Sequence, residues 1–200
     1  MLITKVEIQK KHKDRVSIYV DGEFFCGLML TSCIKYHLKE GLEIEKERLD
    51  FLREETEREN ACEKGLKYLS KAQKTEKEVK TYLKGKGFDD DTVFYAIEKL
   101  KKYDYINDEL YAKNFVKYKS KTDGKKKIEY ELKNKGISDK IIQNTLDSFV
   151  FDENVLENIL EKYLKNKDLD IKTKQKAYRF LMSKGFANDE IMQALNKFFN

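Results

Sequence analysis

Proline and tryptophan are absent from this sequence of 200 residues. Because proline breaks the interior of a helix, a chain without it can form long, uninterrupted helices. Lysine, glutamate and leucine, which favour helices, recur throughout. Hydrophobic residues make up 40% of the chain, which is enough to bury a core in one domain or in a short tandem array. The composition therefore predicts a folded, mainly helical protein.

Cysteine and histidine are too scarce for a disulfide framework or a metal centre. The three cysteines, Cys26, Cys33 and Cys62, are an odd number, are widely spaced and form no Cys-x-x-Cys pair. We expect free, buried thiols in a reducing cytoplasm. The two histidines, His12 and His37, lack the convergent partners that a metal ligand or a catalytic base needs. No metal and no cofactor are therefore expected.

Membrane-spanning and catalytic patterns are also missing. No apolar run approaches the roughly 20 residues needed to cross a bilayer, and the N-terminus does not resemble a signal peptide. No nucleophile elbow, P-loop or dinucleotide-binding fingerprint occurs. The Gly-Lys-Gly segment 85–87 suits a helix end, and the acidic segment 89–91 suits a helix start better than a cation site. We expect a cytoplasmic protein that is not an enzyme.

Charge is unevenly distributed along the chain, although the net charge is only +5. Residues 113–140 contain ten lysines and four acids, a local net charge of +6. Residues 43–63 contain nine acids and four basic residues, a local net charge of −5. A chain polarised in this way can present a basic face to a phosphate backbone or to an acidic protein groove. Ordinary solvated helix surface is the alternative interpretation.

The first thirty residues have the periodicity of strands rather than helices. Val16, Ile18 and Val20 alternate with polar or amphipathic residues. An Asp-Gly step at 21–22 then separates two β-prone runs, which is a strong signal for a type I′ hairpin. Residues 2–8 can supply a third strand. The pattern predicts a small antiparallel meander that packs on a following helix.

A helical repeat of 49 residues occupies most of the chain. Gly87, Gly136 and Gly185 each follow a helical segment and are separated by 49 residues. A glycine at such a position is typical of a left-handed helix C-cap. Apolar residues align around these glycines without a gap. The aligned sets are Val79 with Ile128 and Ala177; Val93 with Ile142 and Ile191; Ile97 with Leu146 and Leu195; Leu100 with Phe149 and Phe198; Cys62 with Tyr111 and Leu160; and Leu66 with Phe115 and Leu164.

The fold class that follows is mainly α, a tandem array of three three-helix repeats after a small N-terminal antiparallel β-meander. We expect the meander and a helical connector in residues 1–58, and the repeats in residues 59–107, 108–152 and 153–200. Each unit of such an array contacts mainly its neighbours, which creates an extended surface suited to a large molecule. We expect a monomer.

The best candidate for a binding surface is the basic stretch 119–127, which joins the first and second helices of the middle repeat. Tyr111, Tyr118 and Tyr130 lie nearby, and basic residues interleaved with aromatics can hold phosphates. Alternatively, the tyrosines belong to the core and the lysines are merely solvated. No arginine or asparagine cluster is placed to recognise base edges. The candidate basic face comprises Lys113, Lys117, Lys119, Lys121, Lys125, Lys126, Lys127 and Lys133.

Four segments carry a resemblance to a known family. Residues 105–116 have the sequence YINDELYAKNFV, and residues 124–137 have GKKKIEYELKNKGI. Residues 61–84 contain LKYLS, EKEV and YLK, and residues 184–191 begin with KGF. Together they resemble the bacterial RecX regulatory proteins over nearly all of the chain. The middle repeat has lysine where those proteins often have arginine, which disfavours bidentate phosphate contacts because lysine acts as a point charge.

The resemblance implies a protein that binds the RecA recombinase on single-stranded DNA. Such proteins lie in the groove of the RecA filament, limit its ATP hydrolysis and strand exchange, and promote its disassembly. RecA is then the enzyme, and the basic face of this chain meets acidic RecA surface or DNA. Two other hypotheses stay open: a protein that binds DNA itself, and a helical-repeat scaffold for another protein partner.

Overall fold

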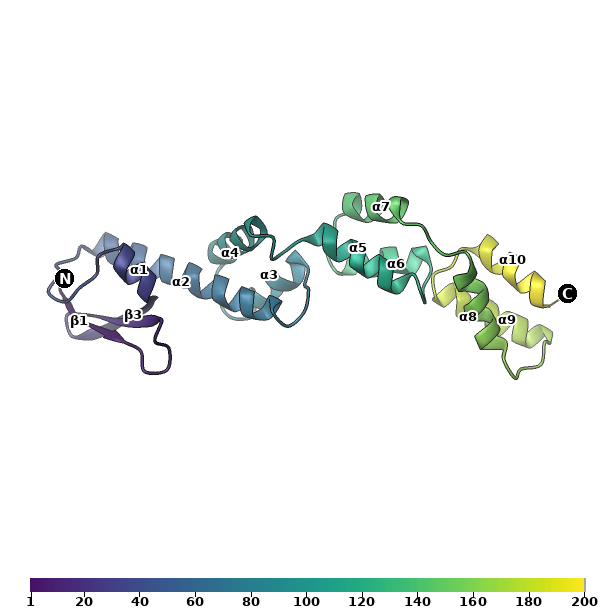
Figure 1. The fold of residues 1–200 in the computed structure, drawn as a ribbon, viewed down its shortest axis with the longest axis horizontal. Coiled ribbons are helices and arrows are strands. Elements are labelled where there is room, and N and C mark those ends of the chain that lie inside the picture. The colour runs from purple at the N-terminus through teal and green to yellow at the C-terminus, as the bar shows by residue number, and fades with distance from the viewer. Residues whose placement is uncertain (200) are drawn as a thin grey trace. The chain divides into compact units, whose positions relative to one another are not determined.

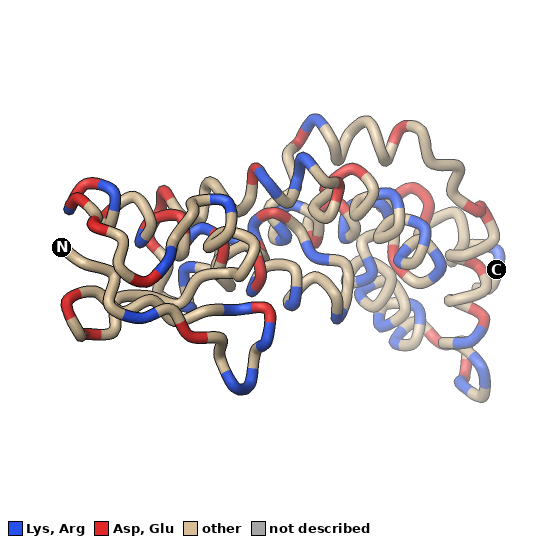
Figure 2. Tube along the Cα trace, turned by 60° about the vertical axis from the view of Figure 1, so that its left-hand side comes forward, with Lys and Arg blue, Asp and Glu red and all other residues tan. Residues whose placement is uncertain are grey.

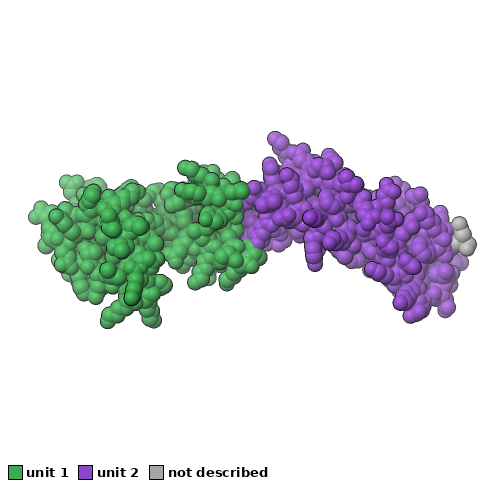
Figure 3. Space-filling model, viewed as in Figure 1, with its two compact units in different colours: residues 1–72, 79–105 green, residues 73–78, 106–200 purple. Residues whose placement is uncertain are grey.

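The protein, described by a computed structural model for residues 1–199, has two compact units. The first comprises residues 1–72 and 79–105, and the second joins residues 73–78 to the described residues from Ile106 onward (Figure 3). Helices dominate both units, and the single sheet lies at the N-terminus (Figure 1). The predicted mainly helical fold with an N-terminal meander is confirmed. No helix in residues 1–199 is long and apolar enough to span a bilayer.

The N-terminal sheet is an antiparallel meander with the order β1-β2-β3. Its strands are β1 (Ile3–Ile8), β2 (Arg15–Val20) and β3 (Glu23–Met29), followed by the short helix α1 (Leu30–Lys35). The β2–β3 turn is formed by Asp21 and Gly22, whose φ angles are +50° and +90°. Positive φ at both central residues is what a type I′ hairpin requires, so the sequence prediction is correct.

Helix α2 (Lys46–Leu69) connects the meander to the first repeat. Leu49 and Leu52, near its start, pack into the core of the meander. Further along α2, Ala61 and Gly65 are buried where the helix packs on α4 (Asp90–Lys102). A Cβ on Gly65 would lie 2.7 Å from a methyl carbon of Leu100, so a larger residue here would require the Leu100 side chain to move. The expected boundary between residues 58 and 59 falls inside this one continuous helix.

Each repeat contains three helices. The first has the C-terminal part of α2 with α3 (Glu76–Lys84) and α4, and the second has α5 (Asp108–Lys119), α6 (Lys125–Asn134) and α7 (Asp139–Ser148). The third has α8 (Asn154–Leu164), α9 (Ile171–Ser183) and α10 (Asn188–Phe198).

The aligned apolar positions form the cores of the repeats. The sets beginning with Val79, Val93 and Ile97 are buried in all three copies. The other sets are less uniform. Leu66 is 37% exposed whereas its third-repeat equivalent, Leu164, is buried, and the half-buried aligned residues are Tyr111, Phe115, Phe149 and Phe198. Each repeat therefore has its own small hydrophobic core, as the periodicity predicts.

Local sequence signals place the helix ends. Gly87, Gly136 and Gly185 have φ of +88°, +85° and +83°, as a left-handed C-cap requires. Thr75 and Glu78 form a capping box at the start of α3, because each side chain accepts a hydrogen bond from the other residue's amide, at 3.2 and 3.1 Å.

Candidate functional site

Four lysines of the predicted basic face are free to meet an anion. Lys113 and Lys117 lie one turn apart on α5, Lys121 follows in the α5–α6 loop, and Lys126 lies in the first turn of α6. All four are exposed, and within residues 1–199 none has a carboxylate within 4.0 Å. Their positive charges are therefore uncompensated by a direct partner. Figure 2 shows that basic and acidic positions alternate along much of the chain.

The other four lysines of the predicted face already have acidic partners. These ion pairs are Lys119 with Glu131 at 2.8 Å, Lys125 with Asp147 at 3.3 Å, Lys127 with Asp123 at 2.8 Å, and Lys133 with Glu129 at 3.0 Å and Asp139 at 3.2 Å. A lysine in such a pair must exchange partners to bind a phosphate, so its contribution to anion affinity is smaller. The structure thus divides the predicted face into a free half and a paired half.

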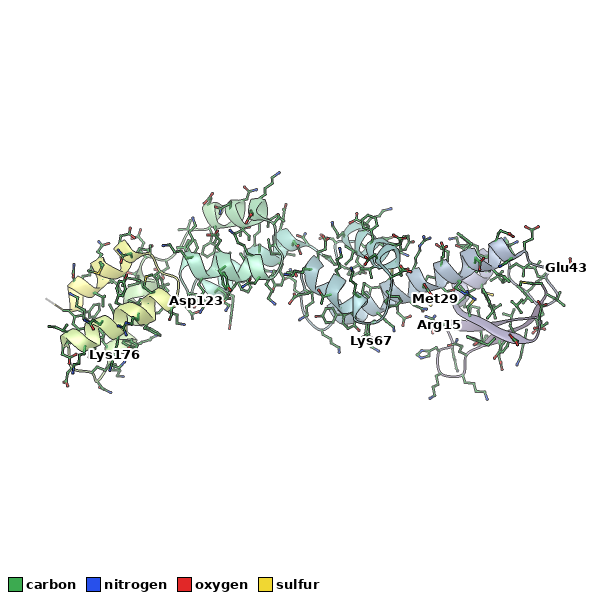
Figure 4. All side chains as sticks on the ribbon, turned by 180° about the vertical axis from the view of Figure 1, so that it is seen from behind. Arg15, Met29, Glu43, Lys67, Asp123 and Lys176 are labelled. Atoms are coloured by element: carbon green, nitrogen blue, oxygen red, sulfur yellow. The ribbon has the colours of Figure 1, made fainter. Side chains whose placement is uncertain are left out.

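Asp123 is the centre of the paired half. Its side chain is buried between the second and third repeats, and Lys119, Lys127 and Lys184 lie within 4.0 Å of it (Figure 4). Burial raises the pKa of the Asp123 carboxyl, but hydrogen bonds from Lys127 and Thr122 and nearby lysine charges outweigh it. The pKa of this carboxyl therefore lies below its ordinary value. Of these lysines, Lys184 comes from the third repeat, so its ion pair with Asp123 links the two repeats.

Two tyrosines of the middle repeat are exposed beside this region. Tyr118 is 73% exposed and Tyr130 is 65% exposed, whereas Tyr111 is half-buried and stacks on Phe115 with ring centroids 6.0 Å apart. The alternative of core tyrosines is thus correct only for Tyr111. Exposed aromatic rings near free lysines can stack on bases while the lysines pair with phosphates.

The third repeat carries a second basic segment, which lies outside the predicted basic face. Residues 162–184 contain eight basic residues and two acids, a local net charge of +6. Of the two acids, Asp170 caps α9 by accepting a hydrogen bond from the Thr173 amide at 2.7 Å. Within residues 1–199, Lys184 forms an ion pair with Asp123, and the other basic residues of this segment form none. The seven others are Lys162, Lys165, Lys167, Lys172, Lys174, Lys176 and Arg179.

This second basic segment was detectable in the sequence, because acids are nearly absent between 162 and 184. What the sequence does not reveal is the state of pairing. The middle repeat has the same local net charge, yet there the carboxylates lie directly against lysines. The basic segments of the middle and third repeats therefore have the same net charge. They differ in how many basic residues lack an ion pair, and that number is larger in the third repeat.

Side chains of the types that bind metal ions, and three cysteine thiols, occur in the described part of the chain. In residues 1–199, no group of three or more His, Cys, Asp or Glu side chains converges as metal ligands do. The three cysteines are buried and unpaired with each other, and burial raises the pKa of each thiol. A raised pKa keeps a thiol protonated and poorly reactive, which agrees with a structural role.

Family models match the chain in four consecutive segments. The regulatory protein RecX N-terminal domain matches residues 1–45. The first, second and third three-helix domains of RecX match residues 61–100, 107–146 and 152–195. The matched segments follow the same order as the meander and the three repeats.

Curated relatives match over almost the full length of both chains. The regulatory protein RecX of Clostridium beijerinckii is 38% identical over 98% of this chain and 94% of its own length. The same protein of Clostridium acetobutylicum is 36% identical over 99% of this chain and 96% of its own. All of them are named as regulatory proteins.

Solved structures of this family have the same fold. A crystal structure of regulatory protein RecX matches with a TM-score of 0.78 and 25% identity, covering 98% of each chain. A crystal structure of RecX from Lactobacillus salivarius matches with a TM-score of 0.64 and 28% identity, covering 70% of this chain and 96% of that one. This chain is therefore a regulatory protein rather than an enzyme, and it belongs to the RecX family.

Proposed function

We propose that this chain binds the RecA recombinase filament on single-stranded DNA and limits its ATP hydrolysis and strand exchange. The observation that supports this function best is the free half of the basic face: four exposed, unpaired lysines on a repeat that also exposes Tyr118 and Tyr130. Such a surface complements acidic protein surface or a DNA backbone, and both occur in a recombinase filament.

The repeat construction gives a physical reason for a filament as partner. Three units with similar cores recur at 49-residue intervals, and a helical polymer also offers the same surface at regular intervals. Weak contacts made by several linked units add up through their high effective concentration. A regulator of this kind needs no catalytic residue, because it acts by binding alone.

The direct test is DNA-dependent ATP hydrolysis by purified RecA as this protein is added. We expect the rate to fall when the added protein reaches stoichiometric amounts relative to RecA. An unchanged rate across that range contradicts the proposal.

A variant pair locates the effect on the middle repeat. Changing Lys113, Lys117, Lys121 and Lys126 to Gln should raise the half-inhibitory concentration about tenfold, since each lost charge weakens a complementary contact. The matched control changes four exposed lysines of the N-terminal domain to Gln: Lys10, Lys11, Lys13 and Lys39. If the control loses as much inhibition, net charge rather than this surface is responsible.

Direct binding to DNA is the second candidate function, and it is favoured by the seven basic residues of segment 162–184 that have no ion pair within residues 1–199. It predicts tight binding to naked single-stranded DNA that weakens steeply with salt. Changing Lys165, Lys167, Lys172 and Lys176 to Gln should then reduce the slope of log affinity against log salt by about 3, at about 0.7 per lost phosphate contact. Weak affinity for naked DNA beside tight affinity for the filament favours the first function.

A further inference from the structure

The second unit contains two inter-repeat junctions of the same design. At the start of α3, the Thr75 hydroxyl donates a hydrogen bond of 2.8 Å to the carbonyl oxygen of Lys135. At the start of α6, the Gly124 amide donates one of 2.8 Å to the carbonyl oxygen of Lys184. Thr75 and Gly124 are 49 residues apart, as are Lys135 and Lys184. The start of the middle helix of one repeat thus packs on the glycine turn that ends the middle helix of the next repeat: α3 on the end of α6, and α6 on the end of α9.

Each junction also contains one ion pair of fixed polarity. The Lys135 ammonium lies 2.6 Å from the Glu78 carboxylate, and the equivalent Lys184 ammonium lies 3.6 Å from the Asp123 carboxylate. In both cases the helix start supplies the acid and the glycine turn supplies the lysine. This polarity also suits the helix dipoles, because the positive start of one helix meets the negative end of another.

The glycine turns are tightly covered at both junctions. A Cβ on Gly136 would lie 2.5 Å from the Lys77 side chain, and one on Gly185 would lie 2.4 Å from Lys127. The apolar residues that follow these glycines, Ile137 and Phe186, are buried.

The equivalent turn of the first repeat is not covered. A Cβ on Gly87 would meet nothing within 4 Å. Lys86 and Gly87 are exposed, and Phe88 is only half-buried. Within residues 1–199 Lys86 has no carboxylate within 4.0 Å, and its ammonium instead lies 5.4 Å from the centre of the Tyr82 ring. The first repeat therefore has a turn of the same sequence design, Lys86-Gly87-Phe88, but no helix start within residues 1–199 packs on it. This uncovered turn is called the seat below.

Within residues 1–199, the 49-residue spacing leaves no further helix start of this design for the seat. Counting back 49 residues from Thr75 reaches Cys26, which belongs to β3 and pairs with β2. The start of α9 is the remaining equivalent, but the positions aligned with Asp123 and Glu78 are Lys172 and Lys176 there. Asp170, the acid just before α9, is already engaged as its N-cap, because it accepts a hydrogen bond from the Thr173 amide at 2.7 Å. A second copy of this chain would therefore bring lysine towards Lys86, which charge repulsion disfavours.

We propose that the turn Lys84–Phe88 receives the start of an α-helix from a different protein. That helix begins with a hydroxyl-bearing residue or glycine, as Thr75 and Gly124 do, and carries Asp or Glu in or just before its first turn. Its first amide or hydroxyl donates to the Lys86 carbonyl, and its carboxylate pairs with the Lys86 ammonium. This inference deepens the proposed function, on which it rests for the identity of the partner, because RecA is then the protein that supplies the helix.

The experiment compares Lys86→Glu with Lys67→Glu for binding to RecA filaments on single-stranded DNA. Lys67 is an exposed lysine of the same unit without an ion pair in residues 1–199, so it makes the same charge change on α2 rather than on the turn itself (Figure 4). We expect Lys86→Glu to weaken binding about tenfold and Lys67→Glu to weaken it less than about twofold. Equal losses in the two variants overturn the inference and leave the proposed function intact.

A second measurement does not depend on RecA. A helix-stapled peptide with the sequence of residues 121–134, which includes Asp123 and Gly124, is titrated into the isotopically labelled protein. We expect the amide resonances of Lys86 and Gly87 to shift, and the same peptide with Asp123→Lys to shift them far less. If the wild-type protein does not bind the filament, the proposed function is wrong. The titration still shows whether the turn Lys84–Phe88 binds a helix start. Absence of a shift with the Asp123 peptide overturns the inference.

Discussion

Gly124 donates its amide to the carbonyl oxygen of Lys184 across 2.8 Å, which places the start of α6 directly on the end of α9. A Cβ on Gly124 would lie 2.5 Å from the backbone of Gly185. Two glycines from different repeats therefore meet backbone to backbone. The contact depends on their lack of side chains, and the two repeats cannot approach this closely otherwise.

Alanine substitutions at the glycines separate two costs. Gly124 has φ of −79°, so Gly124→Ala tests steric overlap alone, whereas Gly87→Ala tests positive φ alone because its Cβ meets nothing. We expect losses in the free energy of unfolding of about 1–3 kcal/mol for Gly124→Ala and about 1 kcal/mol for Gly87→Ala. Gly185→Ala combines both costs and should lose the most. Urea denaturation measures all three, and a Gly185→Ala loss no larger than that of Gly87→Ala contradicts the junction geometry.

Asp123→Asn should destabilise the second unit by about 1–3 kcal/mol, because it leaves partly buried lysine ammonium groups without their common anion. Asp147→Asn is the matched control, since Asp147 is an exposed acid whose one ion pair within residues 1–199 is with Lys125 at 3.3 Å. We expect the control to lose less than about 0.5 kcal/mol, as is usual for an exposed pair. Urea unfolding monitored by circular dichroism compares the two, and similar losses contradict the structural role of Asp123.

Acid should weaken the second unit through the same residue. The folded-state pKa of the Asp123 carboxyl lies below the ordinary value of 3.8, so its ionised form is favoured in the folded state. The stability it contributes is therefore complete above about 3.8 and is lost as the pH falls through the lowered folded-state pKa. Glu78, whose pKa is lowered from 4.5, acts in the same direction. As the pH is lowered from 4.5, the urea concentration at the unfolding midpoint should decrease, and it should decrease less steeply in Asp123→Asn than in the wild type. If the two plots of midpoint against pH are parallel, this assignment is wrong.

Arg15 is expected to hold the meander onto α2. One guanidinium nitrogen donates to Asn60 at 2.6 Å and to the Gly27 carbonyl at 3.0 Å, and the other lies 2.8 Å from the Glu63 carboxylate (Figure 4). Arg15→Lys keeps the charge but cannot make these contacts together, because only arginine has a forked donor.

We expect Arg15→Lys to cost about 1–2 kcal/mol and to raise amide hydrogen exchange in β2 and β3. Lys13→Arg, in the neighbouring exposed loop, serves as the control and should change neither quantity. If exchange in the meander is the same in Arg15→Lys and in the wild type, the strands are held by their hydrophobic core alone.

Several features of the fold follow from short stretches of sequence. The Asp21-Gly22 turn, the Thr75 capping box and the left-handed glycines each depend on the conformational preferences of a few neighbouring residues. The burial of the aligned apolar positions follows from the helical period, because residues three and four apart share a face.

The candidate site was predictable only in part. The sequence locates the lysines, and the loop and helix start that carry them are as expected. It does not reveal which lysines are paired, because Asp123 meets Lys184 from another repeat, 61 residues away. Nor does it reveal that Tyr118 and Tyr130 are exposed, since an aromatic residue on a helix suits either a core or a surface.

By itself the sequence determined the helical repeat, its 49-residue spacing, the hairpin and the charge carried by each repeat, because local conformational preference and periodicity encode them. The tertiary structure alone decided which charges remain free and which glycine turns are covered. Both properties depend on contacts between residues far apart in the chain, such as Thr75 with Lys135 and Asp123 with Lys184. These contacts form only when the helices have folded and the residues that make them are brought together.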